Sequence, residues 1–106
     1  MKAQVNFDSL GGGAKVKFGH VTFQNSINLG FEPKTLTVMT YITAFTDRVR
    51  TYNYDGEKWY CTAGSTYTES QSTPSDIQLT SNGFTMAQSA SIINDLVYMA
   101  TDTVTD

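Results

Sequence analysis

Two carboxylates stand beside a glycine at the sharpest turn signal in the chain, and paired carboxylates are the groups that hydrolyse glycosidic bonds. Asp55 and Glu57 flank Gly56. Asp-Gly between two strand-like runs is also a favoured hairpin turn, and Glu57 can pair with Lys58 or with an arginine. We therefore interpret both carboxylates as turn residues rather than as a catalytic pair.

The other reactive side chains stand alone in the sequence. His20 has no second histidine with which to bind a metal ion, and Cys61 is the only cysteine, which we interpret as a small buried hydrophobic residue. Gly11-Gly12-Gly13 precedes Lys15, but a phosphate-binding loop would continue into a helix, whereas Val16 begins a strand. We expect no catalytic residue, no metal and no cofactor. An enzyme built on a β-sandwich remains an alternative to the two binding functions considered below.

The strongest candidate for a binding site is the hairpin around Gly56. Its strands, residues 48–54 and 57–63, alternate so that arginines and aromatic residues share one face. The candidate ligand-binding residues are Arg48, Arg50, Tyr52, Tyr54 and Trp59, with Tyr67 reaching the same edge from the following segment. This face either roofs the core or forms an exposed platform for sugar rings or a protein partner, and its polar groups favour exposure.

The pairing of this hairpin follows by counting from its turn. A two-residue turn at Asp55-Gly56 places Tyr54 opposite Glu57 and Tyr52 opposite Trp59. Such a turn needs positive φ at both central residues.

The element that must organise the chain is a strand over residues 35–45. Leu36 and Val38 alternate with Thr37 and Met39, so both sides of the strand carry apolar groups. We expect a central strand that is covered on both sides.

Further short strands are predicted before and after it, over residues 16–24, 76–80, 83–86 and 96–101. Between them we expect a polar turn at 24–28, a long Ser/Thr-rich loop at 64–75 and a helical turn within 86–95. This pattern predicts an all-β fold, a single antiparallel β-sandwich or jelly roll over residues 15–106. Residues 1–14 form an arm with a glycine joint, through which the chain would assemble.

The charge and the apolar content of the sequence limit the kinds of partner that the chain can bind. The net charge is −3 and the seven lysines and arginines are scattered, which argues against nucleic acid. No apolar run is long enough to span a bilayer or to act as a signal peptide, so we expect synthesis in a cytoplasm and no membrane insertion.

Four stretches carry a resemblance to a known group of proteins. They are residues 21–23, residues 27–34 (Ile-Asn-Leu-Gly-Phe-Glu-Pro-Lys), residues 77–85 (Ile-Gln-Leu-Thr-Ser-Asn-Gly-Phe-Thr) and residues 97–100. Their order resembles the small β-sandwich modules of tailed-phage tail fibres and baseplates.

The resemblance implies a virion protein, made in the host bacterial cytoplasm, that is often a homotrimer and contributes no catalytic residues. Two functions follow from it. One is a receptor-binding module at the tail tip or baseplate, attaching to the host through a surface glycan. The other is a structural tail or capsid accessory protein that binds only other virion proteins.

Overall fold

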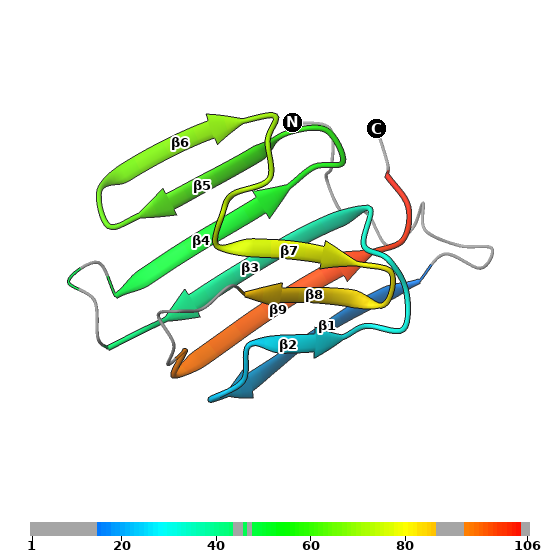
Figure 1. Cartoon of the computed structure of the whole chain (residues 1–106), viewed down its shortest axis with the longest axis horizontal. Coiled ribbons are helices and arrows are strands. Elements are labelled where there is room, and N and C mark those ends of the chain that lie inside the picture. Colours follow the sequence, from blue (N-terminus) through cyan, green and yellow to red (C-terminus); the bar gives the residue numbers. More distant parts are fainter. Residues whose placement is uncertain (1–14, 44–45, 47, 87–92, 105–106) are drawn as a thin grey trace.

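Nine strands in two antiparallel sheets make up the described part of the chain (Figure 1). The computed structural model describes residues 15–43, 46, 48–86 and 93–104. The large sheet runs, in spatial order, β1 (Val16–Thr22), β9 (Asp95–Thr101), β3 (Thr35–Tyr41), β4 (Val49–Tyr54), β5 (Trp59–Ala63) and β6 (Thr66–Ser70). The small sheet runs β2 (Ser26–Asn28), β8 (Gly83–Met86) and β7 (Ile77–Thr80). The predicted all-β antiparallel sandwich is confirmed.

The core lies between the two sheets. The small sheet crosses β1, β9 and β3 and leaves β5 and β6 beyond its edge (Figure 1). Trp59 stacks on Tyr54 with ring centroids 4.8 Å apart, and Phe84 meets Tyr98 edge to face at 6.0 Å. The other buried hydrophobic residues are Ile27, Leu29, Leu36, Val38, Ile42, Tyr52, Ile77, Met86, Ile93, Leu96 and Ala100.

A glycine in the edge strand β1 makes room for one of these rings. Gly19 pairs with Tyr98 across β1 and β9. A Cβ atom at Gly19 would lie 2.8 Å from the Tyr98 hydroxyl oxygen, so only glycine lets the tyrosine ring lie against this strand.

The strand predicted over residues 35–45 is central, but it ends at Tyr41 and only one of its sides is covered. β3 pairs with β9 on one side and with β4 on the other. Leu36, Val38 and Thr40 are buried beneath the small sheet, whereas Met39 and Tyr41 are exposed on the opposite face. The expectation of cover on both sides is wrong for the described residues, and Phe45 lies outside them.

The hairpin is confirmed, but its predicted register is wrong by two residues. Tyr54 pairs with Trp59, and Tyr52 pairs with Cys61. The turn is centred on Gly56-Glu57, because the Asp55 amide donates to the Lys58 carbonyl over 3.1 Å. Gly56 has φ of 94°, whereas no other residue of this turn has positive φ.

The Asp55 side chain accounts for the displaced turn. Its Oδ1 accepts the amide N–H groups of Glu57 and Lys58 at 2.9 and 2.8 Å, and its Oδ2 accepts the Tyr60 hydroxyl at 3.2 Å. Asp55 therefore anchors the turn from a buried position. A shift of two residues returns every side chain to its predicted face, since side chains alternate with a period of two.

Two segments that were predicted to be irregular are strands. Residues 24–28, expected as a turn, contain β2, whose Ile27 is buried. Residues 64–75, expected as a loop, contain β6, a strand whose five residues are all exposed. Both segments are polar. β2 pairs with β8, which is far along the chain, whereas β6 forms a hairpin with the preceding strand β5 across Gly64-Ser65, where Gly64 has φ of 61°.

The hairpin of β7 and β8 and the last strand, β9, agree with the sequence prediction. The predicted N-terminal arm and most of the predicted helical turn lie outside the described residues.

Candidate functional site

The six predicted ligand-binding residues do not form one exposed surface. Trp59 is 1% exposed and Tyr52 is 5% exposed, and Tyr54 is partly buried against Trp59. The expected exposure is wrong for Tyr52 and Trp59, which belong to the hydrophobic core.

The remaining predicted residues are separated. Arg48 is exposed ahead of β4. Tyr67 is 59% exposed but pairs with Thr62 on the opposite face of the sheet. Only Arg50 and Tyr52 meet, at Asp76, which immediately precedes β7.

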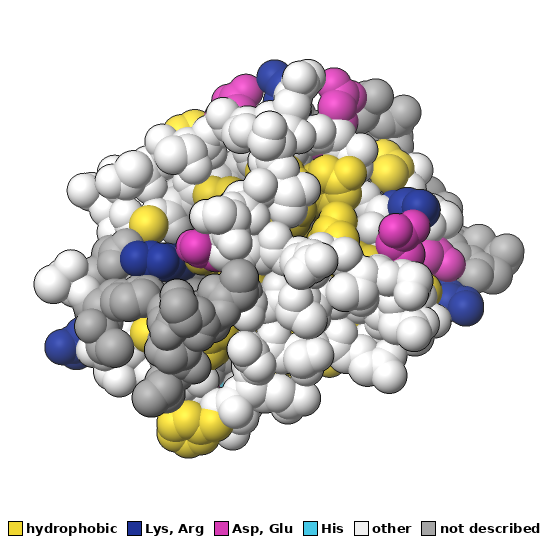
Figure 2. Space-filling view, in the orientation of Figure 1, with side chains coloured by type: hydrophobic (Ala, Val, Ile, Leu, Met, Phe, Trp, Pro, Cys, Tyr) yellow, Lys and Arg dark blue, Asp and Glu magenta, His cyan; other side chains and the backbone are white. Residues whose placement is uncertain are grey.

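Arg50 and Tyr52 line a small polar depression, which we call the inner groove. It lies where the small sheet ends and β5 and β6 continue. Its lining residues are Arg50, Tyr52, Cys61, Thr62, Ala63, Thr66, Thr68, Pro74 and Asp76. Uncharged side chains and backbone cover most of this side of the molecule (Figure 2).

Asp76 is the centre of the groove's hydrogen bonding. Its Oδ2 accepts the Tyr52 hydroxyl over 3.0 Å and lies 3.5 Å from Nη1 of Arg50. Burial, together with the negative charge of Asp76, holds the pKa of Tyr52 well above its usual value. Burial likewise raises the pKa of the Cys61 thiol, so this cysteine is a weak nucleophile at neutral pH.

The chemistry of the inner groove suits a small polar ligand. Arg50 and the hydroxyls of Thr66 and Thr68 offer donors, Asp76 offers an acceptor, and Pro74 contributes an apolar wall. Its volume is about 160 Å³, about half of the smallest pockets that hold drug-sized molecules. The groove therefore has room for one ring-sized group.

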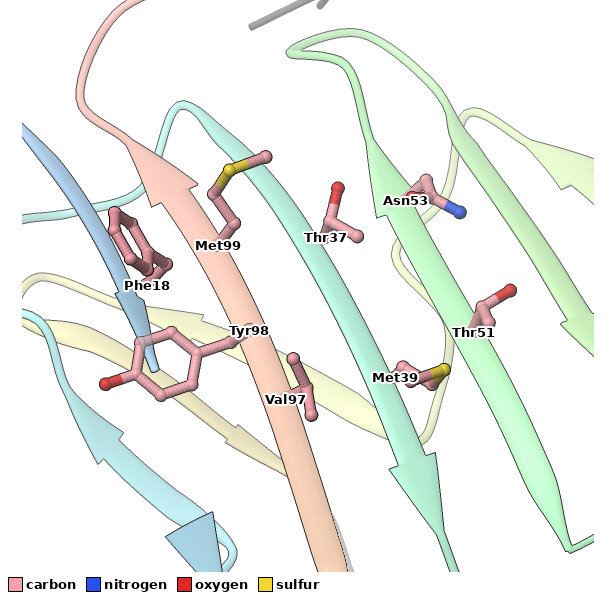
Figure 3. A pocket seen from close by; sticks show the side chains of 8 residues that line it. All are labelled: Phe18, Thr37, Met39, Thr51, Asn53, Val97, Tyr98 and Met99. Carbon is pink, nitrogen blue, oxygen red and sulfur yellow. The ribbon is translucent and has the colours of Figure 1, made fainter. Parts of the chain in front are cut away.

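The second candidate surface is the opposite side of the large sheet, which we call the outer face. Its side chains include, in strand order, Val16, Phe18, His20, Asp95, Val97, Met99, Thr37, Met39, Tyr41, Val49, Thr51, Asn53, Tyr60, Thr62, Tyr67 and Glu69. Phe18 is 68% exposed, Met39 44% and Val97 43%. Figure 3 shows these three side chains with Thr37 and Met99, all of which line one depression. The volume of this depression is about 520 Å³.

Charged groups stand at the rim of the outer face and are paired there. His20 Nε2 lies 2.7 Å from Asp95 Oδ1, as expected of a hydrogen-bonded structural histidine. Lys58 Nζ lies 3.3 Å from Glu69 Oε2 near the other edge. The middle of the face, from β1 to β4, is uncharged in the described chain, and its most exposed large side chains are apolar.

Polar side chains on the outer face largely bond to neighbouring strands. The Thr51 and Thr62 hydroxyls share a hydrogen bond of 2.6 Å, and Asn53 Nδ2 donates to the Tyr60 carbonyl over 3.2 Å. Alternation in residues 35–45 had already placed Met39 and Tyr41 on one side. What the sequence could not indicate is that nothing in the described chain covers that side.

Among the residues that the structure describes, no three metal-ligating side chains come together. Nor does this part of the chain form a helix long and apolar enough to cross a bilayer. Comparison with protein-family models, with curated proteins and with solved structures gave no significant match.

Proposed function

We propose that this chain is a non-enzymatic module of a bacteriophage virion, at the tail tip or baseplate, that binds a glycan of the host surface through the inner groove. The observation that supports a binding role is the cluster of Arg50, Tyr52 and Asp76 beside the apolar wall of Pro74. Placement in a virion rests on the sequence resemblance to tail-fibre and baseplate modules.

Hydroxyl groups of a sugar suit this cluster. An arginine and a carboxylate at one site can donate to and accept from neighbouring hydroxyls of the same ring. Asp76 is held by two hydrogen bonds, so its acceptor oxygens are positioned before a ligand arrives.

The affinity of one groove is expected to be low. A single ring makes few contacts, so we expect a Kd on the order of 1 mM, equivalent to about −4 kcal/mol. Receptor binding at useful strength then requires several grooves on one particle acting together.

The test is binding of the purified chain to bacterial cells and to arrays of bacterial surface polysaccharides. Thr68→Trp should fill the groove and reduce binding at least tenfold, because Thr68 is an exposed lining residue on β6. Tyr67→Trp puts the same side chain on the opposite face of that strand and should leave binding unchanged. Equal binding by both variants would rule out the groove as the receptor site.

A second candidate function is a structural accessory role, in which the chain binds only other virion proteins. The observation that favours it is the uncharged apolar middle of the outer face, which suits a protein surface better than a sugar. Failure of the chain to bind any cell or polysaccharide, with binding to isolated tail proteins, would support this role over the first.

A further inference from the structure

We propose that the outer face is the surface through which copies of this chain associate. This inference does not depend on what the inner groove binds. The occupant that we assign to the face is a second copy of the same chain, packed sheet against sheet.

The first argument is the exposed apolar area. Phe18, Met39 and Val97 lie on three adjacent strands, each with more than two-fifths of its surface exposed. Contiguous apolar area of this kind on a folded protein marks an interaction surface.

The second argument is electrostatic. The chain has a net charge of −3, so two copies repel each other wherever uncompensated carboxylates meet. On the outer face, the described carboxylates Asp95 and Glu69 stand at the rim, where Asp95 lies 2.7 Å from the hydrogen-bonding ring of His20 and Glu69 lies 3.3 Å from Lys58. A copy of the same face can therefore approach the middle without burying an unpaired charge.

The third argument is size. With strands about 4.8 Å apart and a rise of about 3.3 Å per residue, the large sheet presents roughly 29 by 20 Å, or about 600 Å² in projection. Projecting side chains make the accessible area larger than this projection. The accessible area of the outer face therefore approaches the roughly 800 Å² that each partner buries in a standard stable interface.

The fourth argument is shape. Two sheets pack face to face about 10 Å apart when their side chains interdigitate. The depression of about 520 Å³ beside Met39 and Thr37 has room for apolar side chains of a second copy, and Phe18 protrudes beside it (Figure 3).

The experiment is sedimentation equilibrium of the full chain, compared with Met39→Lys and Val97→Lys. Wild type should be a homo-oligomer, and each variant should associate at least 100-fold more weakly, because it brings an unpaired charge into the interface. Gln78→Lys adds the same charge on the exposed side of β7 in the small sheet and should associate as wild type does. Because apolar contact is not screened by ions, 1 M NaCl should not dissociate the wild type.

Two milder variants separate weakened association from loss of the fold. Met39→Gln and Val97→Thr are expected to keep the thermal transition of wild type and still weaken association at least tenfold. Deletion of residues 2–13 should leave the oligomer intact. A monomeric wild type, an oligomer that tolerates both lysine variants, or an oligomer lost only on that deletion would each overturn the proposal.

Discussion

Truncation of Trp59 to alanine tests the assignment of the hairpin's aromatic face to the core. Trp59 is 1% exposed and stacks on Tyr54 at 4.8 Å, so Trp59→Ala removes a fully buried ring and leaves a cavity. Removing a buried Trp costs about 3 to 5 kcal/mol. That is a large share of the 5 to 15 kcal/mol, approximately, by which a domain is stable.

The measurement is urea unfolding followed by circular dichroism, together with a thermal scan. At roughly 4 °C per kcal/mol for a chain of this length, we expect the Tm to fall by about 12 to 20 °C. Tyr67→Ala is the matched control, because Tyr67 is an aromatic residue that is 59% exposed, and it should cost less than about 1 kcal/mol. A loss below about 1 kcal/mol for Trp59→Ala would refute its place in the core.

Four further variants test particular contacts. Gly56→Val should destabilise the fold by about 2 kcal/mol or more, because Gly56 has φ of +94° and a Cβ there would lie 2.6 Å from a methyl group of the C-terminal segment. Gly30→Val, with a similar φ but open space around it, should cost less in the same urea titration. Thr40→Val should raise the free energy of unfolding by about 1 kcal/mol, since the buried Thr40 hydroxyl has no hydrogen-bond partner in the described chain; a loss of stability would show that the hydroxyl is satisfied. Because the folded state holds the pKa of Tyr52 above its unfolded value, the stability from its neutral form is complete below about pH 10 and is lost as the pH rises beyond it. Tyr52→Phe should be less stable at pH 7 through loss of the bond to Asp76, yet lose stability less steeply above pH 10; parallel alkaline curves would contradict this.

Local patterns in the sequence determined most of the described strands, though not β2 or β6, and determined which residues of a strand share a face. Alternation put Leu36 and Val38 on one side and Met39 on the other, and the structure keeps that division. Even the error in hairpin register left Tyr52 and Trp59 on their common face, because a two-residue shift preserves the period of a strand.

The tertiary structure alone decided which faces became core. Both sides of residues 35–41 carry apolar groups, so alternation could not tell which side would be covered. That choice depended on where β2, β7 and β8 dock, and docking is set by contacts between residues far apart in the chain. Tyr52 and Trp59, which the sequence offered as a recognition surface, became part of the core, and the outer face was left uncovered by the described chain.

The inner groove, likewise, could not be predicted from local sequence. Arg50 and Tyr52 were candidates from their types and spacing, but their partner Asp76 is 24 residues from Tyr52 in the chain. Pairing of polar strand β6 with β5 supplies Thr66 and Thr68 to the groove. Polar composition predicted a loop there, but Gly64, with φ of 61°, and Ser65 form a two-residue turn that pairs β6 with the preceding strand β5.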